Sequence, residues 1–147
     1  MMRHRRLEHQ FVRHIPEVLE PGVIYVSMDY ATGAHSCCCG CGQEVVTPFT
    51  PTDWRLTFDG ETISLWPSIG NWNLPCRSHY IIGRSRIIEA DSQSDDQIAA
   101  EHARDKATKI KFYGSEVPAP SPPREYPDAT PIQRSLWVSI KRWIGRT

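Results

Sequence analysis

Apolar and polar residues alternate most regularly between residues 54 and 66, on both sides of an Asp59-Gly60 pair. Asp-Gly is a favoured centre for a tight type I′ turn, so this pattern predicts a β-hairpin with Leu56 opposite Ile63. One face of the hairpin is then apolar and the other polar, which is typical of a hairpin that covers one side of a core. The apolar face comprises Trp54, Leu56, Phe58, Ile63 and Leu65.

Further strands are predicted on both sides of this hairpin. Residues 23–28 and 44–49 are rich in β-branched and aromatic side chains, and Pro48 must lie at an edge or at the end of its strand. Residues 80–82 and 86–88 form a second hairpin pattern, for which two registers are possible. The Pro, Gly and Asn content of residues 67–75 predicts a loop, and the apolar spacing in residues 1–20 permits a short helix that ends at Pro16.

The later part of the chain predicts helices. Ser94 and Gln97 match a capping box, and acids precede bases from there to about residue 112, which favours a helix. After a proline-rich linker at 115–130, residues 131–147 predict an amphipathic basic helix, which suits docking on its own domain, an acidic partner or an anionic membrane surface. The inward stripe of the first helix is thin, so that helix should lie close against the sheet or be held only loosely: Ala99, Ala103, Ala107 and Ile110.

The composition limits the classes of function. The 147 residues suit about one domain, and 17 Lys and Arg balance 17 Asp and Glu, so the overall charge gives no reason to expect a nucleic acid partner. The basic residues 3–6 are followed by polar residues and not by the apolar core of a signal peptide, and no apolar run is long enough for a transmembrane segment. We therefore expect a soluble cytoplasmic protein whose thiols stay reduced.

The five cysteines lie in two places, four of them between residues 37 and 41 and one at Cys76, in a Cys-x-x-His motif with His79. Thiolates and imidazole at this spacing are typical of tetrahedral zinc sites, and Gly40 and Gly42 allow the backbone to turn around a metal. The first half of the site can be formed in two ways, by a knuckle through Cys38 and Cys41 or by an alternating set of Cys37, Cys39 and Cys41.

A zinc ion here suits two roles. A structural ion would replace part of a core, and its binding would contribute to folding. A catalytic ion would act beside His35, Glu44 or Ser78 as acid–base or orienting groups. In both cases we expect an α+β, β-rich fold: zinc clamps a small antiparallel sheet of hairpins at residues 21–114, after a basic segment at 1–20 and with one or two C-terminal helices.

Several motifs recur in order at residues 30–42, 50–54, 58–60, 67–72 and 75–80. Together they resemble a bacterial family, domain-of-unknown-function family 6527, over about residues 22–90. The cysteine loop of that family reads His-x-Cys-x-Cys-Gly-Cys-Gly, which maps onto this chain from His35 and leaves Cys38 at a variable position. The resemblance therefore implies a ligand pool of Cys37, Cys39, Cys41, Cys76 and His79.

Members of that family are often encoded beside bacterial ubiquitin-like modifiers and their E1-like and E2-like enzymes. The resemblance implies such proteins as partners and a role in processing or removing the modifier. Two functions stay open, a metal-dependent peptidase that hydrolyses a ubiquitin-like tail and a non-catalytic, zinc-stabilised module that binds pathway components. The number of protein ligands separates them, because a closed four-ligand site has no position for water and a three-ligand site has one.

Overall fold

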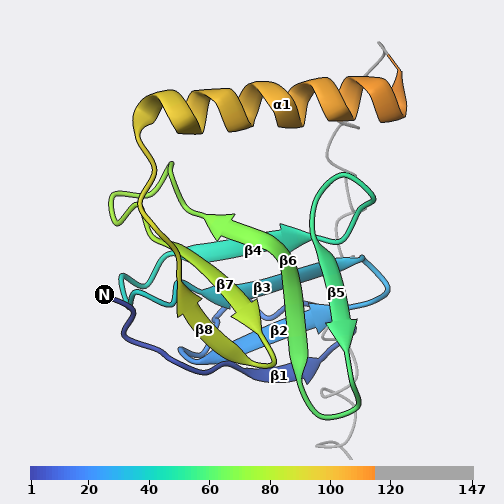
Figure 1. Cartoon of the computed structure of the whole chain (residues 1–147). Helices are drawn as coiled ribbons and strands as arrows, with labels where there is room; N and C mark the ends of the chain where they lie inside the picture. Colours follow the sequence, from blue (N-terminus) through green and yellow to red (C-terminus); the bar gives the residue numbers. More distant parts are fainter. Residues whose placement is uncertain (115–147) are drawn as a thin grey trace, which may run out of the picture. The chain divides into compact units, whose positions relative to one another are not determined.

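The computed structural model describes residues 1–114, which form two four-stranded sheets and one helix (Figure 1). This β-rich arrangement with a late helix confirms the predicted fold class. The predicted linker at 115–130 and helix at 131–147 lie outside the described residues. The helix of the described part is not long and apolar enough to cross a membrane.

The first sheet has the strand order β1-β2-β3-β4, and only its β1–β2 pair is parallel. The second sheet has the order β5-β6-β7-β8, and all its neighbours are antiparallel. The strands of the first sheet are β1 (Glu8–Phe11), β2 (Val23–Ser27), β3 (Thr32–Ser36) and β4 (Glu44–Pro48). Those of the second are β5 (Arg55–Phe58), β6 (Ile63–Gly70), β7 (His79–Gly83) and β8 (Arg86–Glu89).

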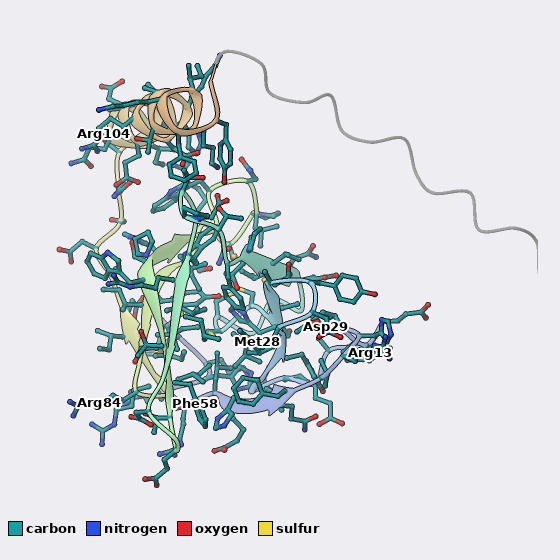
Figure 2. All side chains as sticks on the ribbon, turned by 90° about the vertical axis from the view of Figure 1, so that its right-hand side faces the viewer. Arg13, Met28, Asp29, Phe58, Arg84 and Arg104 are labelled. Carbon is teal, nitrogen blue, oxygen red and sulfur yellow. The ribbon has the colours of Figure 1, made fainter. Side chains whose placement is uncertain are left out.

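The two sheets enclose one core, and their inward side chains fill the space between them (Figure 2). Ile24 and Val26 of β2 pack there with side chains of β6 and β7, all almost completely buried: Ile63, Leu65, Ile69, Tyr80 and Ile82. Burying one large apolar side chain contributes about 1.5–3 kcal/mol, so this shared cluster is what holds the two sheets together.

The N-terminal segment differs from the prediction, because it forms β1 and not a short helix. Backbone bonds explain the difference: Leu7 N donates to Ser85 O at 2.9 Å, Ile87 N donates to Arg5 O at 2.9 Å, and β1 itself pairs with β2. The Leu7 side chain is fully buried in the core. The segment therefore bridges the two sheets, and long-range pairing outweighs its helical spacing.

The hairpin of β5 and β6 exists, but its predicted register is wrong. Leu56 pairs with Leu65 and Phe58 with Ile63, so the loop holds four residues. The Asp59 carboxylate accepts hydrogen bonds from the backbone N–H of Glu61 at 3.0 Å and of Thr62 at 2.6 Å, which holds the wider loop. The shift is by two positions, so the predicted apolar and polar faces are kept.

The predicted loop at residues 67–75 begins later than expected. β6 continues through Pro67 to Gly70, and Ile69 and Gly70 pair with Tyr80 and His79 of β7. Only the part from Asn71 onward is a loop, with a turn in which Arg77 N donates to Leu74 O at 3.0 Å. Prolines are tolerated where no ladder hydrogen bond is needed, so Pro67 does not end the strand.

The helix α1 (Asp95–Tyr113) crosses one end of the sheets (Figure 1) and confirms the predicted capping box. Ser94 Oγ accepts from Gln97 N at 3.3 Å, and Gln97 Oε1 accepts from Ser94 N at 2.9 Å. The predicted inward stripe is wrong, because Ile98 is the buried residue of α1 and all four predicted positions are exposed. Arg104 points away from the sheets (Figure 2).

Candidate functional site

Four thiols come together where the loop after β3 meets the loop before β7. All four sulfur atoms lie within 4.8 Å of one another, with Cys37 Sγ 3.4 Å from Cys39 Sγ and 3.9 Å from Cys76 Sγ. A tetrahedral zinc ion with Zn–S bonds of about 2.3 Å would separate its sulfur ligands by about 3.8 Å. The group of Cys37, Cys39, Cys41 and Cys76, hereafter the thiol cluster, therefore fits a zinc ion.

The backbone around the thiol cluster turns as sharply as a metal site requires. Gly40 and Gly42 have φ of 89° and 79°, in the region that favours glycine, and Cys37 N donates to Gln43 O at 2.8 Å to close the loop. A Cβ on Gly40 would also lie 2.6 Å from Arg3 Cδ. On the other side, Arg77 has φ of 44° directly after Cys76. Both halves of the cluster thus lie on conformationally special turns.

Two buried polar side chains support the sulfur atoms. Ser78 Oγ lies 3.1 Å from Cys37 Sγ and 3.5 Å from Cys76 Sγ, and it accepts a hydrogen bond from Asn71 Nδ2 at 2.8 Å. Ser78 is thus beside the cluster, as the sequence suggested, and its hydroxyl lies within hydrogen-bond distance of two of the sulfur atoms. Groups that hydrogen-bond metal ligands orient them, which is the part these two side chains can play.

The surroundings of the thiols shift their pKa values. Burial raises the pKa of Cys76, but hydrogen bonds from the Ser78 side chain and backbone outweigh it and lower that pKa to about 7. Burial raises the pKa of Cys39 and of Cys37. Because one thiolate discourages ionisation of its neighbours, the cluster gains all four thiolates only with a cation at its centre.

The structure separates the remaining predicted residues from the thiol cluster. Cys38 is buried but outside the group, and Glu44 is exposed at the start of β4. His35 is fully buried and its Nε2 lies 2.7 Å from Tyr80 Oη, while its Nδ1 has no partner among the described residues. Burial lowers the pKa of His35 to about 4, so it is neutral at physiological pH.

His79 also lies outside the thiol cluster, because both its ring nitrogens are engaged elsewhere. Its Nδ1 lies 2.7 Å from the backbone carbonyl oxygen of Asp91, and its Nε2 lies 2.9 Å from Ser68 Oγ. A carbonyl oxygen only accepts, so Nδ1 carries the proton and Nε2 is left to accept from the Ser68 hydroxyl. The Trp72 ring packs against the imidazole, with 5.0 Å between centroids.

This serine–histidine pair was not predicted from the sequence. A serine whose hydroxyl donates to an imidazole, itself oriented by a third group, is the arrangement that activates a hydroxyl as a nucleophile. Ser68 lies in the 67–72 motif and His79 in the 75–80 motif, so the motifs contained both residues. The motifs do not show that β6 pairs with β7, and this pairing brings the two side chains together.

Strand alternation separates the two groups of residues. Asn71 and Ser78 are buried and face the thiol cluster, and Ile69 and Tyr80 of β6 and β7 belong to the core. Ser68 and His79 occupy the alternate positions and are half-buried. Successive side chains of a strand point to opposite faces, so one pair of strands presents the thiol cluster on its inner face and the serine–histidine pair on its outer face.

Ser68 opens into a cleft of about 370 Å³ between the sheets and α1. Pro48, Trp54, Pro67 and Trp72 supply apolar walls, and α1 contributes Glu101, His102, Asp105 and Lys109. This volume lies in the range of pockets that bind small ligands or parts of larger ones. A chemical group that enters the cleft from solvent can therefore reach the Ser68 hydroxyl.

The chain matches the model of one protein family, described as "Bacterial ubiquitination-like system serine protease (BubE)", over residues 11–90. This range includes both strands of the site, the thiol cluster, Ser68 and His79. The match supports the expected association with bacterial ubiquitin-like conjugation but not the family number suggested by the motifs. No curated protein and no solved structure matches the chain.

Proposed function

The chain belongs to this protease family of the bacterial ubiquitination-like system, and on that premise we propose that it is a serine protease with Ser68 as nucleophile and His79 as general base. The proposed substrate is the C-terminal tail of a ubiquitin-like modifier, either in a precursor or in a conjugate. The observation that carries the proposal is the 2.9 Å contact between Ser68 Oγ and His79 Nε2, with Nδ1 held by Asp91 O.

The proposed reaction follows from the tautomer of His79. As Ser68 Oγ attacks the carbonyl carbon of the scissile amide, Nε2 takes the hydroxyl proton and the imidazolium stays oriented by the Asp91 carbonyl. The same proton then passes to the leaving amine, which leaves an ester on Ser68. Water, deprotonated by His79, hydrolyses the ester and restores the hydroxyl.

The thiol cluster has a separate part in this proposal. Cys37, Cys39, Cys41 and Cys76 would hold zinc in a closed site, where the ion supplies a cross-link and leaves no position for water. Cys76, Ser78 and His79 lie within four consecutive positions, so fixing Cys76 also limits the freedom of His79. We therefore propose a structural zinc site that supports the serine–histidine pair.

The test is cleavage of a purified ubiquitin-like precursor with a C-terminal extension, by the wild type, Ser68→Ala and Ser92→Ala. Ser92 is exposed and its side chain makes no hydrogen bond within the described part of the chain, so Ser92→Ala is the matched control. We expect the wild type and the control to release the extension and Ser68→Ala to leave it intact. Cleavage by Ser68→Ala at the wild-type rate would reject the proposal, and absence of cleavage by the wild type would favour a non-catalytic binding module.

A further inference from the structure

The cleft beside Ser68 carries an excess of negative charge. Its lining holds three carboxylates, on Asp53, Glu101 and Asp105, against one ammonium, on Lys109. Lys109 Nζ lies 2.8 Å from Asp53 Oδ1 and 2.9 Å from Asp105 Oδ2, so its single charge is already shared by two acids. The cleft therefore has about two carboxylates without a matching cation, apart from His102.

Glu101 is the acid in the cleft with no ionic contact. Its Oε1 accepts a hydrogen bond at 3.0 Å from the neutral amide of Gln93, which orients the carboxylate without neutralising it. Glu101 is half-buried, as is Lys109. A charge in such a place is less screened by water than one on an open surface, so it discriminates between ligands of opposite sign.

One wall of the cleft is an unpaired strand edge. β5 begins at Arg55, opposite Trp66, so residues 67–70 of β6 have no neighbour in β5, although Ile69 and Gly70 pair with β7. Asn71 N donates to Ser78 O, and in an antiparallel ladder the next residue back, Gly70, directs its N–H and C=O to the other edge. These backbone groups are available to an extended peptide beside Ser68.

Gly70 and Trp72 form one part of the cleft wall. The Trp72 indole lies so close over Gly70 that a Cβ there would be 2.6 Å from Trp72 Cε2. The space above β6 is thus lined by backbone and aromatic surface, and the acids lie across it on α1. Alternate side chains of an added strand project to the same side, so one of them can face these acids.

We infer that the cleft binds an extended peptide in which a lysine or arginine near the scissile bond contacts Glu101 and Asp105. This inference rests on the proposed protease function and names the specificity of the same site. The basic side chain completes the charge balance of the cleft, while its backbone lies along residues 67–70 of β6. The cleft therefore selects tails with a basic residue near the scissile bond and repels acidic tails.

The test uses the full-length protein and a set of tailed ubiquitin-like precursors, in which each position within four residues of the scissile bond is changed to Arg, Ala or Glu. At one position we expect Arg to raise kcat/KM about fivefold or more over Ala, the effect of a partly exposed ion pair, and Glu to lower it. In Glu101→Gln the Arg-to-Ala ratio should fall toward one, and in Glu101→Lys the preference should shift to Glu. Glu61→Gln, an exposed acid in the β5–β6 loop, is the matched control and should keep the wild-type ratio.

A binding measurement separates this inference from the proposed function. Synthetic tail peptides are titrated into Ser68→Ala, which needs no turnover, and the Arg peptide should bind more tightly than the Glu peptide at low salt. Equal cleavage of Arg, Ala and Glu tails would overturn the inference and leave the protease intact. Preferred binding of Arg peptides without any cleavage by the wild type would overturn the protease and keep the basic-peptide cleft.

Discussion

The inner and outer faces of the β6–β7 pair have the same backbone but opposite environments. On the inner face Ser78 is buried between Asn71 and the sulfur atoms of the thiol cluster. On the outer face Ser68 lies at a cleft with a half-buried histidine beside it. Ser68 and Ser78 thus have different chemistry. Successive side chains of a strand point to opposite faces, so only Ser68 is placed where a substrate can reach it.

The largest difference between the faces should appear in catalysis. Replacing Ser68 by Ala removes the nucleophile, and we expect kcat/KM for tail cleavage to fall at least about 10³-fold. The melting temperature and the zinc content should stay those of the wild type, because the Ser68 side chain is not part of the core. A matching loss in Ser92→Ala, or a fall in zinc content of Ser68→Ala, would mean that the faces are not independent.

The next largest effect should be on stability, from the inner face. Replacing Cys37 by Ser removes one of four zinc ligands, and we expect at least about 3 kcal/mol less stability, or a melting temperature lower by roughly 10 °C, with loss of bound zinc. Cys38→Ala is the control, since Cys38 lies outside the cluster, and it should retain one zinc per chain. Metal analysis with thermal unfolding checks both, and a zinc-free Cys38→Ala protein would contradict the ligand set.

The third effect is a pH dependence of stability that comes from the buried His35. Burial lowers the pKa of His35 in the folded protein to about 4, from about 6.5 when unfolded, so the unfolded chain binds the proton first as the pH falls. The stability contribution of neutral His35 is therefore complete above pH 6.5 and is lost between pH 6.5 and 4, by roughly 3 kcal/mol. Urea unfolding of the wild type against His35→Gln measures it, because loss of zinc at low pH affects both proteins. Identical pH slopes for the two proteins would show that His35 titrates normally.

The smallest effect concerns the support of the sulfur atoms. Asn71→Ala removes the amide that donates to Ser78 Oγ, and we expect a loss of about 1 kcal/mol in stability with zinc affinity weaker by about tenfold. Competition with a chromogenic chelator measures the affinity. Unchanged affinity in this variant would show that Ser78 is held without Asn71.

The sequence reveals the thiol cluster more readily than the serine–histidine pair, for a physical reason. Closely spaced cysteines are typical of metal sites, so their spacing indicates a zinc site. The spacing leaves open which cysteines bind, and the family resemblance implies a pool that includes Cys37, Cys39, Cys41 and Cys76. Ser68 is an ordinary residue until β6 pairs with β7, and the Asp91 group that orients His79 is a backbone carbonyl, which leaves no sequence signature.

The structure places two parts of the site in positions that local patterns do not indicate, for the same reason. The Cys-x-x-His spacing makes His79 one of five candidate ligands, yet the turn at Arg77 and the start of β7 direct it to the outer face. The Pro, Gly and Asn content of residues 67–75 predicts a loop, yet pairing with β7 extends the strand to Gly70. Local patterns describe a segment by itself, whereas both residues of the pair are placed by contacts distant in sequence.

The most direct measurement of the central claim is reaction of the zinc-loaded protein with a fluorophosphonate, followed by peptide mapping by mass spectrometry. Such a reagent phosphonylates a serine that a neighbouring base activates: the serine oxygen bonds to phosphorus and fluoride leaves. We expect one adduct, on Ser68, which disappears in His79→Gln while the protein keeps its zinc. An adduct on Ser78, or a Ser68 adduct that persists without His79, would contradict the assignment of nucleophile and base.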